Sequence, residues 1–188
     1  DIRKTQKKHL KDPIGGHFDY GRQGTSTTHA LSKILAKLEE SYHVFLTPTG
    51  FGSVFLAMFS VLRPEDEILV SDPVYGPTRI LTQDFFKDFN IKAIFYNPRD
   101  LSTLKNNISK KTKLIFVENP GSNTFEFQDL SKIISIAKKN KIFTAMDNTW
   151  GTPYFLKPIK LGFDMAIVSA TKYYSGHSDV MGGSLAIN

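Results

Sequence analysis

The sequence alternates between short apolar runs and longer segments with a helical period, and this alternation limits the possible folds more than any other feature. The short runs are apolar at nearly every residue rather than at every second one; they are residues 44–46, 68–70, 91–95, 114–117, 142–146 and 165–168. Strands of this kind are buried on both faces, as in parallel sheets covered by helices. Segments with a period near 3.6 lie between most of them, at residues 51–62, 77–89, 101–108 and 130–139. The sequence therefore predicts an α/β fold with a mostly parallel sheet flanked by helices.

The two ends of the chain differ from this pattern. Residues 1–25 are polar, contain Pro13 and a Gly-Gly pair, and have no sustained period, so we expect an irregular N-terminal arm. Residues 26–188 would form one α/β domain. The stretch 185–187 is apolar and follows glycines without an intervening helix, so we expect a final antiparallel strand.

A helix is expected to begin the predicted domain. Its apolar face would consist of Leu31, Ile34, Leu35 and Leu38. Ser26, Thr27 and Thr28 are the candidates for its N-cap, because their hydroxyl groups can accept a backbone N–H.

Composition excludes several classes of protein. The chain has no cysteine, so it has neither disulfides nor a cysteine nucleophile, and its five histidines show no metal-binding spacing. No apolar run approaches the roughly 20 residues that span a bilayer. The net charge of +6 is spread along the chain, beside predicted helix ends, rather than gathered as in nucleic-acid-binding proteins. We therefore predict a cytoplasmic protein with a small-molecule partner, without metal, membrane or nucleic acid.

Lys172 stands just after the apolar run 165–168, where that predicted strand ends. Ligands of parallel sheets bind beyond the carboxyl ends of the strands. A lysine at this place can bond covalently to a carbonyl ligand, and the hydroxyl groups of Ser169 and Thr171 could hold a phosphate. The alternative is an ordinary surface lysine, and these residues alone leave both interpretations open.

Three further features lie at the ends of other predicted strands. Gly50 and Phe51 join a strand to a helix, where free N–H groups can bind an anion or simply form a tight turn. Asp147 could pair with a buried cation or cap a helix. Tyr75 could stack on a flat ring or cover the edge of the core. Together with Lys172 these groups fit pyridoxal 5′-phosphate, which needs a lysine, a carboxylate at its ring nitrogen and a phosphate site.

Five collinear motifs make the sequence resemble the Cys/Met-metabolism family of pyridoxal-phosphate enzymes. They are Y-G-R-Q-G-T at 20–25, Tyr75 after S-D-P-V, E-N-P-G-S at 118–122, D-N-T-W at 147–150 and S-A-T-K-Y-Y-S-G-H-S-D at 169–179. The resemblance implies the large domain of a fold-type I enzyme, with seven strands of which one is antiparallel. It implies that this chain ends before the family's small C-terminal domain.

The resemblance also implies roles for individual residues. Lys172 would bond to the cofactor and act in catalysis, Asp147 would hold the ring nitrogen, and Tyr75 would stack on the ring and take part in catalysis. The phosphate would be held by Gly50, Phe51, Ser169 and Thr171. Tyr20 and Arg22 would reach the cofactor of a neighbouring subunit in a homodimer or homotetramer.

Within the family, Gly24-Thr25 and Trp150 resemble the cystathionine β-lyase branch. That branch implies a carbon–sulfur lyase of methionine biosynthesis, which converts the amino-acid thioether L-cystathionine to homocysteine, pyruvate and ammonia. Three alternatives stay open: a γ-lyase or γ-synthase, another cysteine-S-conjugate β-lyase, and a truncated, inactive remnant of such an enzyme.

Overall fold

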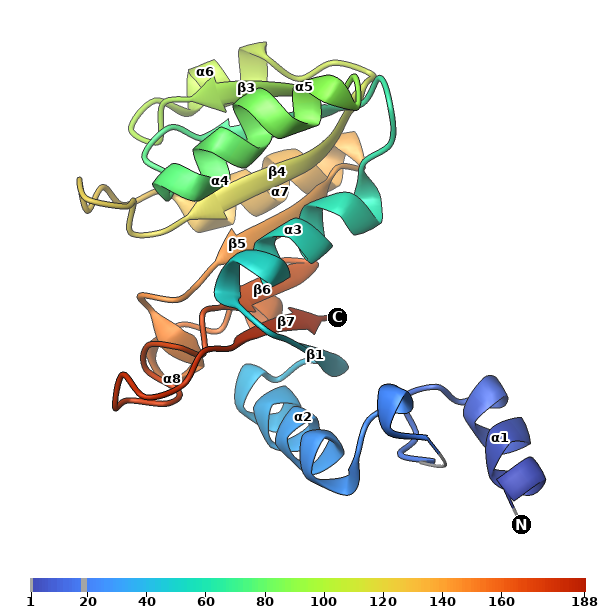
Figure 1. Cartoon of the computed structure of the whole chain (residues 1–188). Coiled ribbons are helices and arrows are strands. Elements are labelled where there is room, and N and C mark those ends of the chain that lie inside the picture. The colour runs from blue at the N-terminus through green and yellow to red at the C-terminus, as the bar shows by residue number, and fades with distance from the viewer. Residues whose placement is uncertain (1, 18–19) are drawn as a thin grey trace.

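A seven-stranded sheet with the order β1-β7-β6-β5-β4-β2-β3 forms the centre of the computed structural model, which describes residues 2–17 and 20–188 (Figure 1). Asp1 and residues 18–19 of the predicted arm lie outside the described residues. The strands are β1 (His43–Thr47), β2 (Glu67–Ser71), β3 (Lys92–Tyr96), β4 (Thr112–Glu118), β5 (Phe143–Asp147), β6 (Met165–Val168) and β7 (Gly183–Ile187).

One strand runs against the others. β7 pairs antiparallel with both β1 and β6, whereas the pairs β2–β3, β2–β4, β4–β5 and β5–β6 are parallel. The predicted fold class, including the antiparallel last strand, is confirmed. As a result β1 to β6 share one direction, and their carboxyl ends lie along the same edge of the sheet.

Helices cover both faces of this sheet. Their bounds are α1 Ile2–Lys11, α2 Ser26–Glu39, α3 Gly50–Val61, α4 Gly76–Ile80, α5 Phe86–Asp88, α6 Leu101–Asn106, α7 Leu130–Asn140, α8 Thr152–Phe155 and α9 Pro158–Leu161. A π turn, Leu81–Phe85, joins α4 to α5, and a 3-10 turn spans Gly21–Gln23. Figure 1 shows α3, α4 and α5 in front of the sheet and α7 behind it. None of the described helices is long and apolar enough to cross a membrane.

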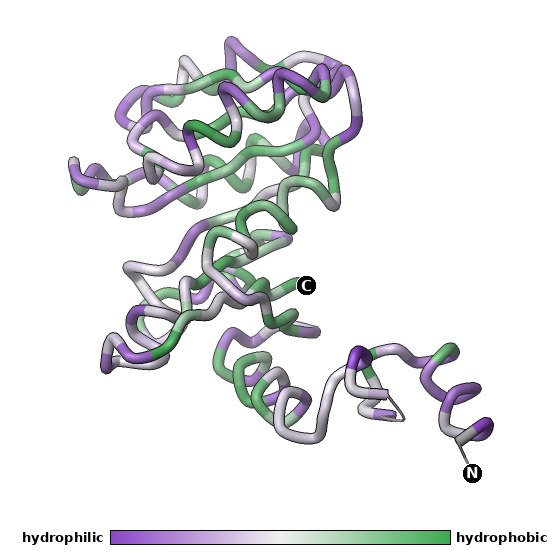
Figure 2. Tube along the Cα trace, viewed as in Figure 1, coloured by the Kyte–Doolittle hydropathy of each residue, from purple (hydrophilic) through white to green (hydrophobic). Residues whose placement is uncertain are grey.

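The continuous apolar strands are explained by this layering. Ile68 and Val70 pack with Met58 of α3 and Phe86 of α5, whereas Leu69 between them packs with Ile133 of α7. All six side chains are fully buried. In Figure 2 the hydrophobic colour is concentrated on the strands and on the helix faces that cover them. Every second residue thus enters the core on each face, so neither face can be polar.

The predicted apolar face of α2 is not the face that packs on the sheet. Leu35 is buried, but Leu31 and Ile34 are 46% and 62% exposed. Ser32 is buried instead, because its hydroxyl donates to the carbonyl of Val44 at 2.5 Å. The predicted N-cap is also wrong by at least one residue. Thr25 is the cap and forms a reciprocal capping box with Thr28.

The prediction of an irregular arm is wrong for its first part, because Ile2–Lys11 forms helix α1. Most of these ten residues are Lys, Arg, Gln or Leu, which have high helix propensity. Apolar periodicity does not reveal such a helix, because only Ile2 and Leu10 among these ten residues are apolar. In Figure 1 this helix extends away from the sheet.

A buried carboxyl connects α2 to the segment that follows Lys172. Glu39 is fully buried, and its Oε1 accepts a hydrogen bond of 2.9 Å from the hydroxyl of Tyr174. Burial raises the pKa of Glu39 from 4.5 to about 7, although the Tyr174 hydrogen bond and the charge of Lys157 lower it. The Glu39 carboxyl of the folded protein therefore stays protonated over a pH range in which the same carboxyl is ionised in the unfolded chain.

We predict that Glu39→Gln removes a pH-dependent loss of stability. Wild-type stability falls as pH rises from 4.5 to about 7, because in this range the unfolded state binds fewer protons. Glutamine does not ionise, so the free energy of unfolding of Glu39→Gln, relative to that of wild type, should rise by roughly 3 kcal/mol between pH 4 and pH 8. Urea unfolding at both pH values measures this change.

The neighbouring Glu40→Gln is the matched control. Glu40 lies exposed on the same helix end and pairs with Lys157 and Lys160. Its replacement should show no such gain at pH 8, since it removes two surface ion pairs. An equal improvement in both variants would contradict the role given to burial of Glu39.

Candidate active site

Lys172 lies in the turn that follows β6, at the carboxyl edge of the sheet. Its Nζ donates to the hydroxyl oxygen of Ser169 at 3.1 Å, and its side chain is exposed. The turn is closed by backbone bonds from Lys172 N–H to the Ser169 carbonyl at 3.0 Å and from Gly176 N–H to the Lys172 carbonyl at 2.8 Å. The lysine is thus presented to solvent from a backbone that is fixed on both sides.

Asp147 lies beside this turn, at the end of β5. It pairs in register with Ile167 of β6, and its Oδ1 accepts a 3.0 Å hydrogen bond from the N–H of Thr149. The Thr149 hydroxyl accepts in turn from the N–H of Ser169 at 2.8 Å. Burial raises the pKa of Asp147, while the Thr149 hydrogen bonds and the charge of Lys172 lower it. The structure therefore brings Asp147, Ser169 and Lys172 together.

Gly50 begins α3 and lies against the same serine. A Cβ atom at Gly50 would be 2.5 Å from both Cβ and Oγ of Ser169, so a side chain at this position would collide with the turn. The helix is capped by Thr49, whose side chain accepts from the N–H of Gly52 at 2.9 Å. The first N–H groups of a helix have no intrahelical acceptor, so this contact places anion-binding groups beside Ser169. Phe51, 40% exposed, is the next residue of that helix.

Thr171 lies in the turn of Lys172, but its hydroxyl is already used. It donates to the Gly182 carbonyl and accepts from the Gly182 N–H, both at 3.1 Å. These bonds close the loop 171–182 onto the beginning of β7. Phosphate binding by this hydroxyl would require it to exchange one of these partners.

Tyr75 lies at the start of α4, beyond the end of β2, and its side chain is 46% exposed. Its N–H donates to Oε2 of Glu118 at 2.7 Å. Glu118 ends β4 and pairs in register with Asp147 on β5. Burial and, to a lesser degree, the charge of Asp147 raise the pKa of Glu118 to about 7. Glu118 begins the E-N-P-G-S motif, but no role was predicted for it from the sequence.

Tyr20 and Arg22 are not brought to this edge. Both are exposed, and the guanidinium of Arg22 lies 5.7 Å from the centre of the Tyr20 ring. In Figure 1 their short 3-10 segment lies between α1 and α2, on the other side of the molecule from the red loop that follows β6. The chain's own site is therefore built without them.

The groups at this edge form the set that pyridoxal phosphate requires: an amine, a partly buried carboxyl, an anion-binding helix start and an exposed aromatic ring. Among residues 2–17 and 20–188, no three His, Asp or Glu side chains are grouped so that they could hold a metal ion. The cradle formed by Gly50 and Ser169 is too tight for a side chain, as is expected where a backbone approaches a ligand closely.

Comparison with known proteins gives the same indication. A family model described as "Cys/Met metabolism PLP-dependent enzyme" matches residues 2–188. The chain is 36% identical over 172 residues to cystathionine beta-lyase MetC of Bacillus subtilis, covering 92% of this chain and 44% of that protein. It is 33% identical over 177 residues to an L-alanine/L-glutamate racemase of Wolbachia pipientis, covering 94% of this chain and 43% of the racemase.

Among solved structures, the chain is similar to that of metY from Campylobacter jejuni, which contains N'-pyridoxyl-lysine-5'-monophosphate. The identity is 34% and the TM-score 0.81, with 84% of this chain and 39% of that one covered. The chain spans about half the length of the curated relatives it matches. The predicted family and its cofactor, pyridoxal phosphate, are confirmed: the chain belongs to the Cys/Met-metabolism family of PLP-dependent enzymes.

Proposed function

We propose that the chain carries the cofactor site of a carbon–sulfur lyase that acts on L-cystathionine by β-elimination. The products would be homocysteine, pyruvate and ammonia, and the reaction would be a step of methionine biosynthesis in the cytoplasm. The observation that carries this proposal is the meeting of Lys172, Asp147 and the Gly50 turn around Ser169. Each group comes from a different strand end.

In this proposal the residues of the edge hold pyridoxal phosphate as follows. Lys172 bonds to its aldehyde carbon through Nζ, and the carboxylate of Asp147 holds a proton on the ring nitrogen. The N–H groups of Gly50 and Phe51, with the hydroxyls of Ser169 and Thr171, hold the phosphate. Tyr75 covers the ring. When bound, pyridoxal phosphate accepts the electron pair left on the substrate's Cα.

Lys172 is also the group that moves protons during the reaction. When the amino group of cystathionine takes the place of Lys172 on the aldehyde carbon, the freed Nζ takes the proton from Cα, and the bond between Cβ and sulfur then breaks with its electron pair going to sulfur. The sulfur takes up a proton and leaves as homocysteine. The remaining three-carbon fragment takes up water and gives pyruvate and ammonia. Asp147, held by the Thr149 N–H, stays beside the ring nitrogen throughout.

The β-lyase branch is favoured by the named relatives. Cystathionine beta-lyases of Bordetella avium and Bacillus subtilis are 35% and 36% identical to the chain. The racemase relative favours a second candidate, in which the proton taken from Cα returns to the opposite face of the same carbon. Both reactions begin with the same proton transfer to Lys172, so only the products distinguish them.

An assembly of two or more copies is part of the proposal. Tyr20 and Arg22 are exposed and lie away from their own chain's site, where they could reach a neighbouring cofactor phosphate. The exposed Leu31 and Ile34 of α2 lie shortly after them in sequence. Exposed apolar surface of this kind often marks a contact between subunits.

We predict that the chain with added pyridoxal phosphate shows the visible absorbance of a lysine-bound cofactor and releases pyruvate from L-cystathionine. Lys172→Ala should show neither, because it lacks the amine. Absorbance and product assays on the purified chain measure both. Formation of 2-oxobutyrate would indicate γ-cleavage, and D-alanine from L-alanine would indicate racemisation. Absorbance that persists in Lys172→Ala would contradict the role of this lysine.

Gly50→Ala should weaken pyridoxal-phosphate binding by at least about tenfold, because the methyl group would displace α3 or Ser169 and remove charged hydrogen bonds to the phosphate. Spectroscopic titration of the chain with the cofactor measures the dissociation constant. Gly76→Ala is the matched control, since a Cβ there would meet no atom within 4 Å. Equal affinity in the two variants would exclude Gly50 from the phosphate site.

A mixing experiment tests the role of Arg22 across subunits. Arg22→Ala and Lys172→Ala should each lose cofactor absorbance when pure. In a hybrid dimer, the Arg22→Ala chain supplies Lys172 and its partner supplies the arginine, so one site is complete. When equal amounts of the two variants assemble at random, about half of the dimers are hybrids. Roughly one quarter of all sites should therefore be restored. The two variants are mixed by unfolding and refolding them together, and mass spectrometry verifies that hybrids form. If the cofactor absorbance does not return although hybrids are present, Arg22 does not contribute to the neighbouring site.

A further inference from the structure

Glu118 is a further residue of the candidate site, because it contacts both the Asp147 position and the Tyr75 backbone. Asp147 and Glu118 are paired in register on adjacent parallel strands, so their side chains leave the sheet on the same face, with strand axes only about 4.8 Å apart. The carboxyl of Glu118 also accepts the Tyr75 N–H at 2.7 Å. One side chain thus connects two of the groups that would surround the cofactor ring.

The backbone of Glu118 is fixed, so its side chain has a defined starting point. Its N–H donates to the Ser71 hydroxyl at 3.1 Å, and its carbonyl accepts from the Gln128 side chain at 2.9 Å. The first bond joins β4 to the end of β2, and the second joins it to the residues before α7. A reorientation of the carboxyl would therefore have to come from its own side-chain torsions.

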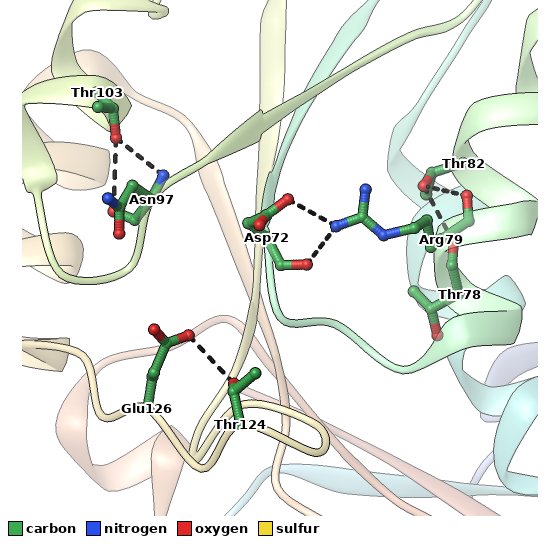
Figure 3. Close-up of polar contacts among 8 residues, drawn as sticks. All are labelled: Asp72, Thr78, Arg79, Thr82, Asn97, Thr103, Thr124 and Glu126. Atoms are coloured by element: carbon green, nitrogen blue, oxygen red, sulfur yellow. Dashed lines mark hydrogen bonds and ion pairs between the residues drawn. The ribbon is translucent and has the colours of Figure 1, made fainter.

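The turn that holds Tyr75 is closed independently of Glu118. Asp72 and Arg79 form an ion pair of 2.7 Å across it, which Figure 3 shows together with Glu126 on a separate loop. The N–H of Ser122 also donates to the Pro73 carbonyl at 2.6 Å. These contacts keep the turn near the sheet. Glu118 is the group that accepts the N–H of Tyr75 itself.

We infer that Glu118 is a positioning residue, which holds Tyr75 over the cofactor ring and places a second carboxyl beside the Asp147 that holds the ring nitrogen. This inference rests on the proposed function of Lys172 and Asp147. It gives Glu118 two separable effects. One effect is geometric, through the Tyr75 N–H, and the other is electrostatic, through Asp147.

The electrostatic effect depends on pH. The titratable groups around Glu118 are Asp147 on β5, Tyr75 in its turn and, beyond Asp147, Lys172. Burial and the charge of Asp147 raise the pKa of Glu118 to about 7. Glu118 is therefore mainly neutral at pH 6 and mainly ionised at pH 8.5. When ionised, it adds negative charge that favours a protonated ring nitrogen.

The test measures the dissociation constant of pyridoxal phosphate for the full chain at pH 6 and pH 8.5. Glu118→Gln keeps an acceptor oxygen but no charge, so it should bind within about threefold of wild type at pH 6 and several-fold more weakly at pH 8.5. Glu118→Ala removes the acceptor and should bind roughly tenfold more weakly at both pH values. Glu126→Gln, on the loop of Figure 3, should bind like wild type at both.

Amide hydrogen exchange at Tyr75 provides a readout that does not depend on the cofactor. The Tyr75 N–H should be protected in wild type and in Glu118→Gln, and should exchange at least about tenfold faster in Glu118→Ala. The inference would be overturned if Glu118→Ala bound pyridoxal phosphate as tightly as wild type. It would also be overturned if the ratio of the dissociation constants of Glu118→Gln and wild type did not change with pH. If wild type itself binds no pyridoxal phosphate, the proposed function fails, and so does the cofactor role of Glu118. The exchange data would then still show whether Glu118 holds Tyr75.

Discussion

The parallel register of β4, β5 and β6 is the constraint on which the candidate site depends. It places Glu118 beside Asp147, and Asp147 beside Ile167, two residues before Ser169. A slip of one residue would turn each of these side chains to the other face of the sheet. The slip is opposed by the core, because Val117 and Met146, next to the two carboxyls, are fully buried. The apolar residues that pack the sheet therefore also set the positions of the groups of the candidate site.

A second constraint acts on the loops rather than the strands. The beginning of α3 lies between the turn after β6 and the start of β7, and glycine is needed on both sides. A Cβ at Gly50 would collide with Ser169, and one at Gly183 would lie 2.3 Å from the Thr49 carbonyl. The antiparallel return of β7 brings Gly183 to this place. The one strand that breaks the parallel pattern thus helps to close the site against the helix.

The central strands could be predicted from the sequence because burial on both faces leaves a local signal in each of them, whereas the edge strands β1 and β3 are only partly buried. The positions of Lys172 and Asp147 followed from this, since each comes at the end of such a run. The packing face of α2 could not be predicted. Ser32 and Glu39 are buried through partners 12 and 135 residues away in sequence, the Val44 carbonyl and the Tyr174 hydroxyl. Glu118 was overlooked for the same reason, because its neighbours Asp147 and Tyr75 become visible only when strands are paired.

The carboxyls also connect the site to the stability of the chain. Burial raises the pKa of Glu39, Glu118 and Asp147, so each costs free energy when it ionises in the folded state. The net charge of +6 does little to offset this, since solvent and salt screen exposed charges. The cost at Asp147 and Glu118 can be relieved by a cation bound beside them, whereas the cost at Glu39 is already reduced by the charge of Lys157 and the hydrogen bond from Tyr174. A ring nitrogen that carries a proton would be such a cation, so cofactor binding should stabilise the fold where the free site weakens it.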